Sequence, residues 1–236
     1  MKLVKNIEEN KKKNNQISDR EAEEAIKIIT MVNNMKLVKD TDQLEKKQQI
    51  LDQEAEEAIK TIIKWIGENP EREGLKSTPK RVIKAFKEYF QGYKEDPSNY
   101  LTKTFKEIDG YDDMIIEKNI SIRSHCEHHM APIIGVAHVS YIPSTKVVGL
   151  SKLARVVEAF SKRLQTQERL TMQIAKTIMD VLQPRGVAVT IDAAHQCMTS
   201  RGIKKENTTT VTNYFLGVFK DDLSFQNRYL RYINKD

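Results

Sequence analysis

Apolar residues follow two different periods along the chain. Alternation of apolar with polar or small residues predicts strands, over residues 112–123, 133–142, 187–193 and 208–219. Apolar positions three or four apart predict helices, beginning at Thr78 and covering residues 150–164, 166–182 and 221–234. Because strands and helices do not alternate strictly, the pattern indicates an α+β fold with a largely antiparallel sheet.

The first 60 residues differ from the rest, since they contain no glycine, proline or aromatic residue. Met-Lys-Leu-Val-Lys occurs at 1–5 and again at 35–39, and Glu-Ala-Glu-Glu-Ala-Ile-Lys at 21–27 and 54–60. Two copies are too few for a repeat array, so a duplicated helical leader is expected. We predict a variable N-terminal helical arm over residues 1–53 and a folded domain over 54–236. The second copy runs into Trp65 and leads into the folded domain, so this helix is expected to pack on the core.

Composition limits the class of protein. The chain has 236 residues, 39% of them hydrophobic, and no apolar run of 18 or more, so neither a membrane span nor a secretory signal is expected. Two cysteines do not make a disulfide framework, and a reducing cytoplasm is the expected location. Residues 1–60 carry a net charge of −1 and residues 61–236 a net charge of +7, which together give +6 for the chain. This positive charge suits a nucleotide or a nucleic acid as a partner, or it reflects only a soluble basic surface. Acidic residues flank the lysines at 11–13, which argues against a nucleic-acid tail.

Both cysteines and four of the five histidines lie in two short segments. Cys126 and His129 are three apart, so one tight turn can direct both at a single metal ion, and Cys197 could complete the set. Two thiolates and one imidazole suit zinc, and three protein ligands leave a fourth position for water, as in catalytic sites. A disulfide between Cys126 and Cys197 is the structural alternative.

Two further histidines lie beside these candidate ligands. His195 precedes Cys197 by two residues, so an extended strand would put both on one face. His128 adjoins His129, and both extra histidines could move protons. A zinc deaminase would need His-x-Glu followed by Pro-Cys-x-x-Cys, and this combination is absent from the sequence.

Other polar residues are weaker candidates when each is taken alone. Ser151, Lys152 and Arg155 open a helix whose N-terminal amides could hold phosphates. Arg81 and Arg201 are equally consistent with solvated surface charges, and Glu168 with an ordinary carboxylate at a helix start.

Taken together, these segments resemble GTP cyclohydrolase I. The matching motifs are Cys-Glu-His-His at 126–129, Gly-Leu-Ser-Lys at 149–152, Gln-Glu-Arg-Leu at 167–170, His-x-Cys at 195–197, Arg201-Gly202 and Thr78-Pro79-x-Arg81. The resemblance spans about residues 55–234 and does not reach the duplicated leader.

The resemblance implies a tunnelling fold, in which antiparallel sheets with helices on one face join into an oligomeric barrel. Two five-membered rings would form a homodecamer with active sites at subunit interfaces. The implied reaction converts GTP and water to 7,8-dihydroneopterin triphosphate and formate, the first step of pterin and folate biosynthesis. A regulatory partner and allosteric control fit the resemblance, whereas nucleic acid and membrane partners do not.

The resemblance also assigns roles to residues. Zn2+ would be bound by Cys126, His129 and Cys197, and would lower the pKa of a bound water. Acid–base steps would fall to His128 and His195, and the ribose rearrangement to Ser151. Substrate binding would involve Gln167, Glu168, Lys152, Arg155, Arg201 and Arg81, with Glu168 on the guanine edge and the basic residues on the triphosphate. A catalytically inert GTP-binding relative and another tunnelling-fold pterin enzyme are the alternatives.

Overall fold

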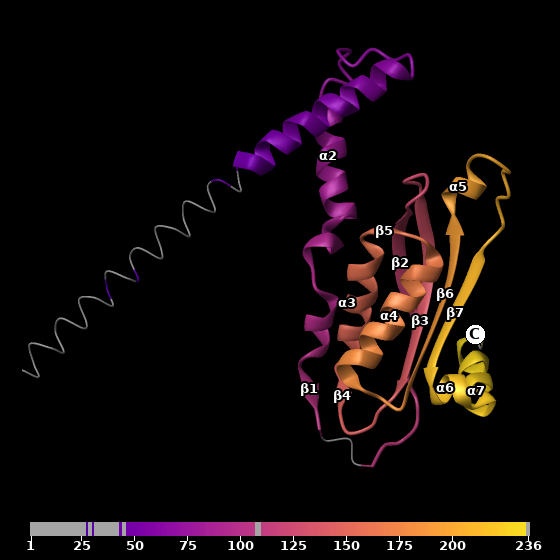
Figure 1. Cartoon of the computed structure of the whole chain (residues 1–236). Helices are drawn as coiled ribbons and strands as arrows, with labels where there is room; N and C mark the ends of the chain where they lie inside the picture. The colour runs from indigo at the N-terminus through magenta and orange to yellow at the C-terminus, as the bar shows by residue number, and fades with distance from the viewer. Residues whose placement is uncertain (1–26, 28–29, 31–42, 44–45, 107–109, 235–236) are drawn as a thin grey trace, which may run out of the picture. The chain divides into compact units, whose positions relative to one another are not determined.

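The computed structural model describes residues 27, 30, 43, 46–106 and 110–234 (Figure 1). The chain divides into two compact units, Met1–Ile83 and Lys84–Asp236. Most of the first repeat copy, including residues 1–5 and the lysines at 11–13, lies outside the described residues. The division into an arm over 1–53 and a domain over 54–236 stays a prediction.

In the first unit, residues 46–65 are helical, as the spacing of the second repeat copy predicts. Ile63 is only 7% exposed, whereas Trp65 is 82% exposed. That this helix packs on the core of the folded domain stays a prediction. Residues two positions apart on a helix lie about 200° apart around its axis. Because Ile63 faces inward, Trp65 therefore faces outward. Leu51, Ile62 and Ile66 are exposed as well, and with Trp65 they form an exposed apolar stripe.

Helix α2, Thr78–Tyr89, begins where Thr78 and Pro79 predict a helix start, and it spans the boundary between the units. Two short 3-10 helices follow, η1 (Gln91–Lys94) and η2 (Pro97–Leu101). The Asp96 carboxylate caps η2 by accepting a hydrogen bond from the Ser98 backbone N–H, at 3.0 Å.

A five-stranded sheet forms the centre of the second unit. Its strands, in spatial order, are β5 (Leu164–Gln165), β2 (Ile115–Cys126), β3 (Pro132–Ile142), β6 (Gly186–His195) and β7 (Thr210–Gly217). Neighbours are antiparallel except for β2 and β5. The four predicted strands are confirmed, with β2 starting and ending three residues later than expected. A small separate pair joins β1 (Thr104–Phe105) to β4 (Val147–Val148).

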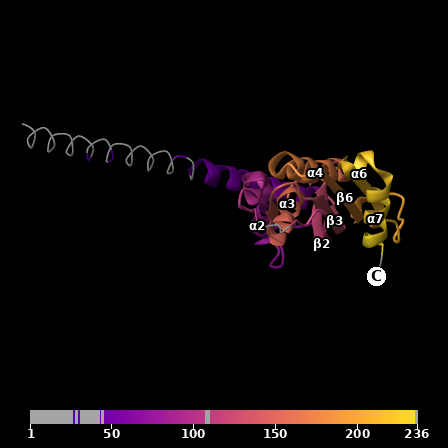
Figure 2. The ribbon, with the colours of Figure 1, turned by 90° about the horizontal axis from the view of Figure 1, so that it is seen from below.

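Helices α3 (Leu150–Ser161) and α4 (Gln167–Leu182) lie along one face of this sheet (Figures 1 and 2). Their apolar sides bury Val189 and Ile191 of β6 in the main core. The two C-terminal helices, α6 (Val218–Asp221) and α7 (Leu223–Ile233), contribute to a smaller core with Ile142 and Ala188, which face the other side of the sheet. The predicted α+β class is confirmed. No helix among the described residues is long and apolar enough to cross a membrane.

Helix α3 runs from one end of the sheet to the other. Its start follows β4, where the Val148 N–H donates to the Tyr141 hydroxyl at 3.2 Å, and Tyr141 pairs with Ile115 at the beginning of β2. Its end leads to β5, which pairs with His125 and Cys126 at the other end of β2. Twelve helical residues span about 18 Å. The two ends are called the cysteine end and the α3-start end below.

Candidate functional site

A tight turn at the end of β2 presents Cys126 and His129. The Cys126 N–H donates to the Ala131 carbonyl, and the Met130 N–H to the Cys126 carbonyl, each at 2.8 Å. Met130 has a φ of 53°, a left-handed conformation that lets the chain reverse into β3. The prediction that one turn carries both side chains is confirmed.

Cys197 reaches the same place from a different kind of element. Strand β6 ends at His195, and the chain turns into the short helix α5, Gln196–Thr199. The expectation that Cys197 continues the strand is therefore wrong, because the backbone becomes helical one residue earlier. The helical turn still directs Cys197 against the main core, which it contacts.

The ligand atoms of Cys126, His129 and Cys197 all lie within 4.8 Å of one another. Zinc bonds to sulfur at about 2.3 Å and to imidazole nitrogen at about 2.0–2.1 Å, so small side-chain adjustments would let three such atoms share one ion. Both cysteines are free thiols, which does not support the disulfide alternative. Burial, followed by the nearby Cys126, raises the pKa of the Cys197 thiol. A bound cation would oppose both effects, so the donor set fits a metal ion.

His128 lies beside this cluster. Its Nδ1 is 3.7 Å from the Cys126 Sγ, and its Nε2 is 4.0 Å from an oxygen of Glu127. The other Glu127 oxygen accepts a hydrogen bond from the guanidinium of Arg169 on α4. Glu127 and Arg169 were missed by the sequence reasoning, although both lie inside the quoted motifs. They tie the ligand turn to the start of α4.

His195 lies against the first residue of α4. Its Nε2 is 2.8 Å from the Gln167 Oε1. Burial lowers the pKa of His195, and the Glu168 carboxylate partly offsets this effect. A lowered pKa keeps the imidazole neutral near pH 7, as a proton acceptor requires.

Glu168 opens onto a shallow pocket of about 530 Å³ between α4 and β7. Thr212, Asn213 and Tyr214 of β7 line its other side. The Thr166 hydroxyl caps α4 by accepting from the Arg169 N–H at 3.3 Å, which fixes the helix start that carries Glu168. The β7 residues were also missed, since strand periodicity does not say which helix a strand faces.

Most of the chain is similar in sequence to known proteins. The family model described as GTP cyclohydrolase I matches residues 55–234. The chain belongs to the GTP cyclohydrolase I family. A protein named GTP cyclohydrolase 1 from Pelagibacter ubique is 71% identical over 202 residues, which cover 85% of this chain and 100% of the relative. Proteins with the same name from Maricaulis maris and Hyphomonas neptunium are 55% and 56% identical, over 74% and 72% of this chain and 85% and 82% of their own lengths.

The family confirms the resemblance and gives the fold its type, an α+β tunnelling fold. The match to the Pelagibacter relative leaves 34 of the 236 residues outside it. The two Met-Lys-Leu-Val-Lys segments are also 34 residues apart. The part of this cyclohydrolase family member that the match leaves out is therefore as long as one copy of the duplicated leader.

The remaining predicted residues do not all lie at the cysteine end. Arg201 follows α5, and its charge acts to lower the Cys197 pKa, so it belongs to this end. Ser151, Lys152 and Arg155 lie in the first two turns of α3, at the α3-start end. Arg155 there has its guanidinium 5.9 Å from the ring centre of Tyr100. Arg81 belongs to the first unit.

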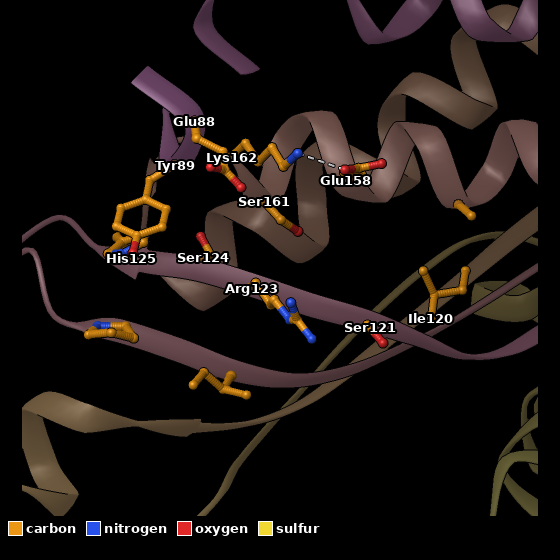
Figure 3. Close-up of a pocket in the computed structure, with 13 residues that line it drawn as sticks. Glu88, Tyr89, Ile120, Ser121, Arg123, Ser124, His125, Glu158, Ser161 and Lys162 are labelled. Atoms are coloured by element: carbon orange, nitrogen blue, oxygen red, sulfur yellow. Dashed lines mark ion pairs between the residues drawn. The ribbon is translucent and has the colours of Figure 1, made fainter. Parts of the chain in front are cut away.

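A larger cavity of about 680 Å³ runs along the outer edge of β2 (Figure 3). Tyr89 stacks on His125 with ring centres 4.8 Å apart, and Lys162 pairs with Glu158 at 2.7 Å. Arg123 and Ser121 lie farther along β2 (Figure 3). None of the described residues that line this cavity is a predicted site residue of the family, so size alone does not identify the site.

Proposed function

We propose that this family member catalyses the GTP cyclohydrolase I reaction, converting GTP and water to formate and 7,8-dihydroneopterin triphosphate. The observation that carries the proposal is the convergence of Cys126, His129 and Cys197 beside His128 and His195. Bound by these three residues, Zn2+ would supply a water molecule of lowered pKa for hydrolysis. Two hydrolytic steps open the imidazole ring and free C8 as formate, and ring closure after ribose rearrangement releases one water.

The protein's own groups would manage protons and hold the base. His195, kept neutral by burial, would accept a proton near the reacting ring, and His128 would serve the neighbouring acid–base steps. The Glu168 carboxylate, an acceptor only, suits the N–H donors on the guanine edge, and the pocket beside it supports this role. Ser151 would assist the ribose rearrangement.

Triphosphate binding would fall to Lys152, Arg155, Arg201 and Arg81, with the N-terminal amides of α3 adding their partial positive charge. Gln167 is implied by the resemblance to contact the substrate as well. The length of α3 separates Ser151, Lys152 and Arg155 from the metal ligands of the same chain. A complete site would therefore take the α3-start end of a second subunit.

A homo-oligomer would provide such a shared site. Among the described strands, β7 pairs only with β6, and the outer edge of β2 pairs only with β5 at His125 and Cys126. Two unpaired edges on one sheet can join neighbouring copies into a barrel. A decamer of two five-membered rings is our proposal. A cytoplasmic location is supported by the two free thiols, and a regulatory partner stays a prediction.

The decisive experiment incubates the purified full chain with Zn2+ and GTP. Formate is quantified, and the pterin is detected by its fluorescence after oxidation. Equal amounts of formate and pterin triphosphate would support the proposal. GTP binding without formate would instead identify an inert relative, and formate without the pterin would point to a different tunnelling-fold reaction.

A further inference from the structure

Gln167 is an almost fully buried polar residue at the start of α4, with 1% of its surface exposed. Its Nε2 lies near three acceptors: the Ile191 carbonyl at 3.0 Å, the Thr210 carbonyl at 2.6 Å and the Thr212 hydroxyl at 3.2 Å. Its Oε1 lies 2.8 Å from the Nε2 of His195. The side chain thus connects β6, β7 and the candidate catalytic histidine.

These partners determine which way the amide points. A carbonyl oxygen only accepts hydrogen bonds, so the atom facing both Ile191 and Thr210 must be the NH2 group. Reversing the amide would set an oxygen against two carbonyl oxygens and leave buried acceptors without a donor, which is strongly unfavourable. The two amide hydrogens are therefore shared among the three acceptors, and Oε1 must face His195.

An amide oxygen facing an imidazole nitrogen requires that nitrogen to carry the proton. We infer that Gln167 is a positioning residue that holds His195 with its proton on Nε2, which leaves the Nδ1 lone pair for the reaction. With its NH2 hydrogens shared among three acceptors and its oxygen engaged by His195, the Gln167 side chain has little capacity left for substrate. This role differs from the substrate contact that the family resemblance implies, and it rests on the proposed function, in which His195 moves a proton.

The test replaces Gln167 by methionine, which has similar length but no hydrogen-bonding amide. Without its partner, His195 would occupy both tautomers and a wider range of ring orientations. Loss of a residue that orients a catalytic group typically costs about 10- to 100-fold. We expect kcat to fall by about that factor, with KM for GTP changed less than about threefold and with zinc content unchanged. A raised KM at unchanged kcat would mean that Gln167 binds substrate, and would overturn the inference.

Gln165→Met is the matched control. Gln165 is 2% exposed, and its Nε2 donates to the Phe160 carbonyl and the Gln173 side chain, both at 2.9 Å. The substitution removes an equally buried amide close by, but neither of these two hydrogen-bond partners is His195. We expect kcat within about twofold of the wild type once folding is confirmed. An equal loss of kcat in both variants would show that the effect is general loosening, and would count against the inference.

A second measurement does not depend on any Gln167 variant folding. The full wild-type chain, labelled with ¹⁵N-histidine, is examined by solid-state NMR without substrate, and His195→Asn identifies the His195 signals. We expect a protonated Nε2 and an unprotonated Nδ1 in the neutral ring. The opposite tautomer would overturn the inference. Because this reading needs no turnover, absence of formate release would refute the proposed function without deciding the tautomer.

Discussion

The cysteine end and the α3-start end of the sheet are built in contrasting ways. At the cysteine end, Cys126, His129 and Cys197 converge from a turn and a short helix, with ligand atoms within 4.8 Å of one another. The buried side chain of Gln167 connects β6 and β7 to His195 at this end. At the α3-start end, Ser151 and Arg155 are exposed on a helix that begins about 18 Å away.

This difference is consistent with two separate tasks, chemistry at the cysteine end and triphosphate binding at the α3-start end. The candidate metal ligands and proton-transfer residues, which would have to meet one reacting atom within a fraction of an ångström, lie in one chain, where packing fixes their geometry. The groups proposed to bind the triphosphate would act through charge, which tolerates looser placement, so they can come from a neighbouring subunit. The comparison can be tested by damaging each end separately.

The largest effect is expected from Cys197→Ser at the cysteine end. A serine hydroxyl stays protonated near neutral pH and is a poor zinc ligand compared with a thiolate. Zinc content, measured by mass spectrometry, should fall away and formate release should drop to background. Far-UV circular dichroism controls for folding. A variant that keeps its full zinc content and activity would refute the assignment of the ligands.

Lys152→Ala and Arg155→Ala should affect the α3-start end alone. A hydrogen bond to a charged group contributes about 1.5–3 kcal/mol, so each change should lower kcat/KM by about 10- to 100-fold, mainly through KM. Zinc content should not change. Lys162→Ala, at the other end of α3 and paired with Glu158, is the control and should leave KM unaltered. An equal rise in KM for all three variants would argue for a general charge effect.

Mixed oligomers would show whether the two ends that form one site belong to different chains. Cys197→Ser chains coexpressed in equal amount with Lys152→Ala/Arg155→Ala chains should recover roughly a quarter of the wild-type activity at low GTP, because random assembly unites two intact ends in about one site in four. Each variant alone should be inactive in the same assay. Absence of recovery in verified mixed oligomers would place both ends of a site in one chain.

Tyr229→Phe should lower stability without touching either end's chemistry. The buried Tyr229 hydroxyl on α7 lies 2.9 Å from both the His138 carbonyl and the Thr190 hydroxyl. Losing these bonds should reduce the free energy of unfolding by about 1–2 kcal/mol. Urea unfolding at a fixed protein concentration measures the loss. A simultaneous fall in zinc content would show that the far face of the sheet is coupled to the cysteine end.

The smallest expected effect is on the pH dependence of folding stability. Burial, followed by the Lys118 charge, lowers the pKa of His138, with Asp192 in partial opposition. An unfolded histidine takes up a proton near pH 6.5, so this contribution to stability is present above that value and is lost as the pH falls below it. Thermal unfolding between about pH 7 and pH 5 should therefore be less pH-dependent in His138→Asn. An unchanged slope would assign the dependence to other groups.

Much of the fold follows from local patterns. Alternation along residues 133–142 and 187–193 predicts β3 and β6, because each buries one face under the helices. Thr78 and Pro79 mark the start of α2 by their chemistry alone. The three candidate ligands that converge in the structure could also be picked out from the sequence, since Cys and His are few and clustered.

Long-range relations were not accessible in the same way. Periodicity could not reveal that the backbone becomes helical at Gln196, that Gln167 faces His195, or that α3 runs away from the cysteine end. Each depends on how elements pack, and sequence spacing carries no distance between elements. The helical pattern of the second repeat copy also did not show that Ile63 is buried while Trp65 is exposed.

The exposed Trp65 gives this protein an optical property. It is the only tryptophan in the chain, so the intrinsic tryptophan emission of the whole molecule originates from one helix face. Indole emission moves to shorter wavelength when water is excluded. Emission recorded on serial dilution would therefore report contact with the stripe of Leu51, Ile62, Trp65 and Ile66 in real time, independently of turnover.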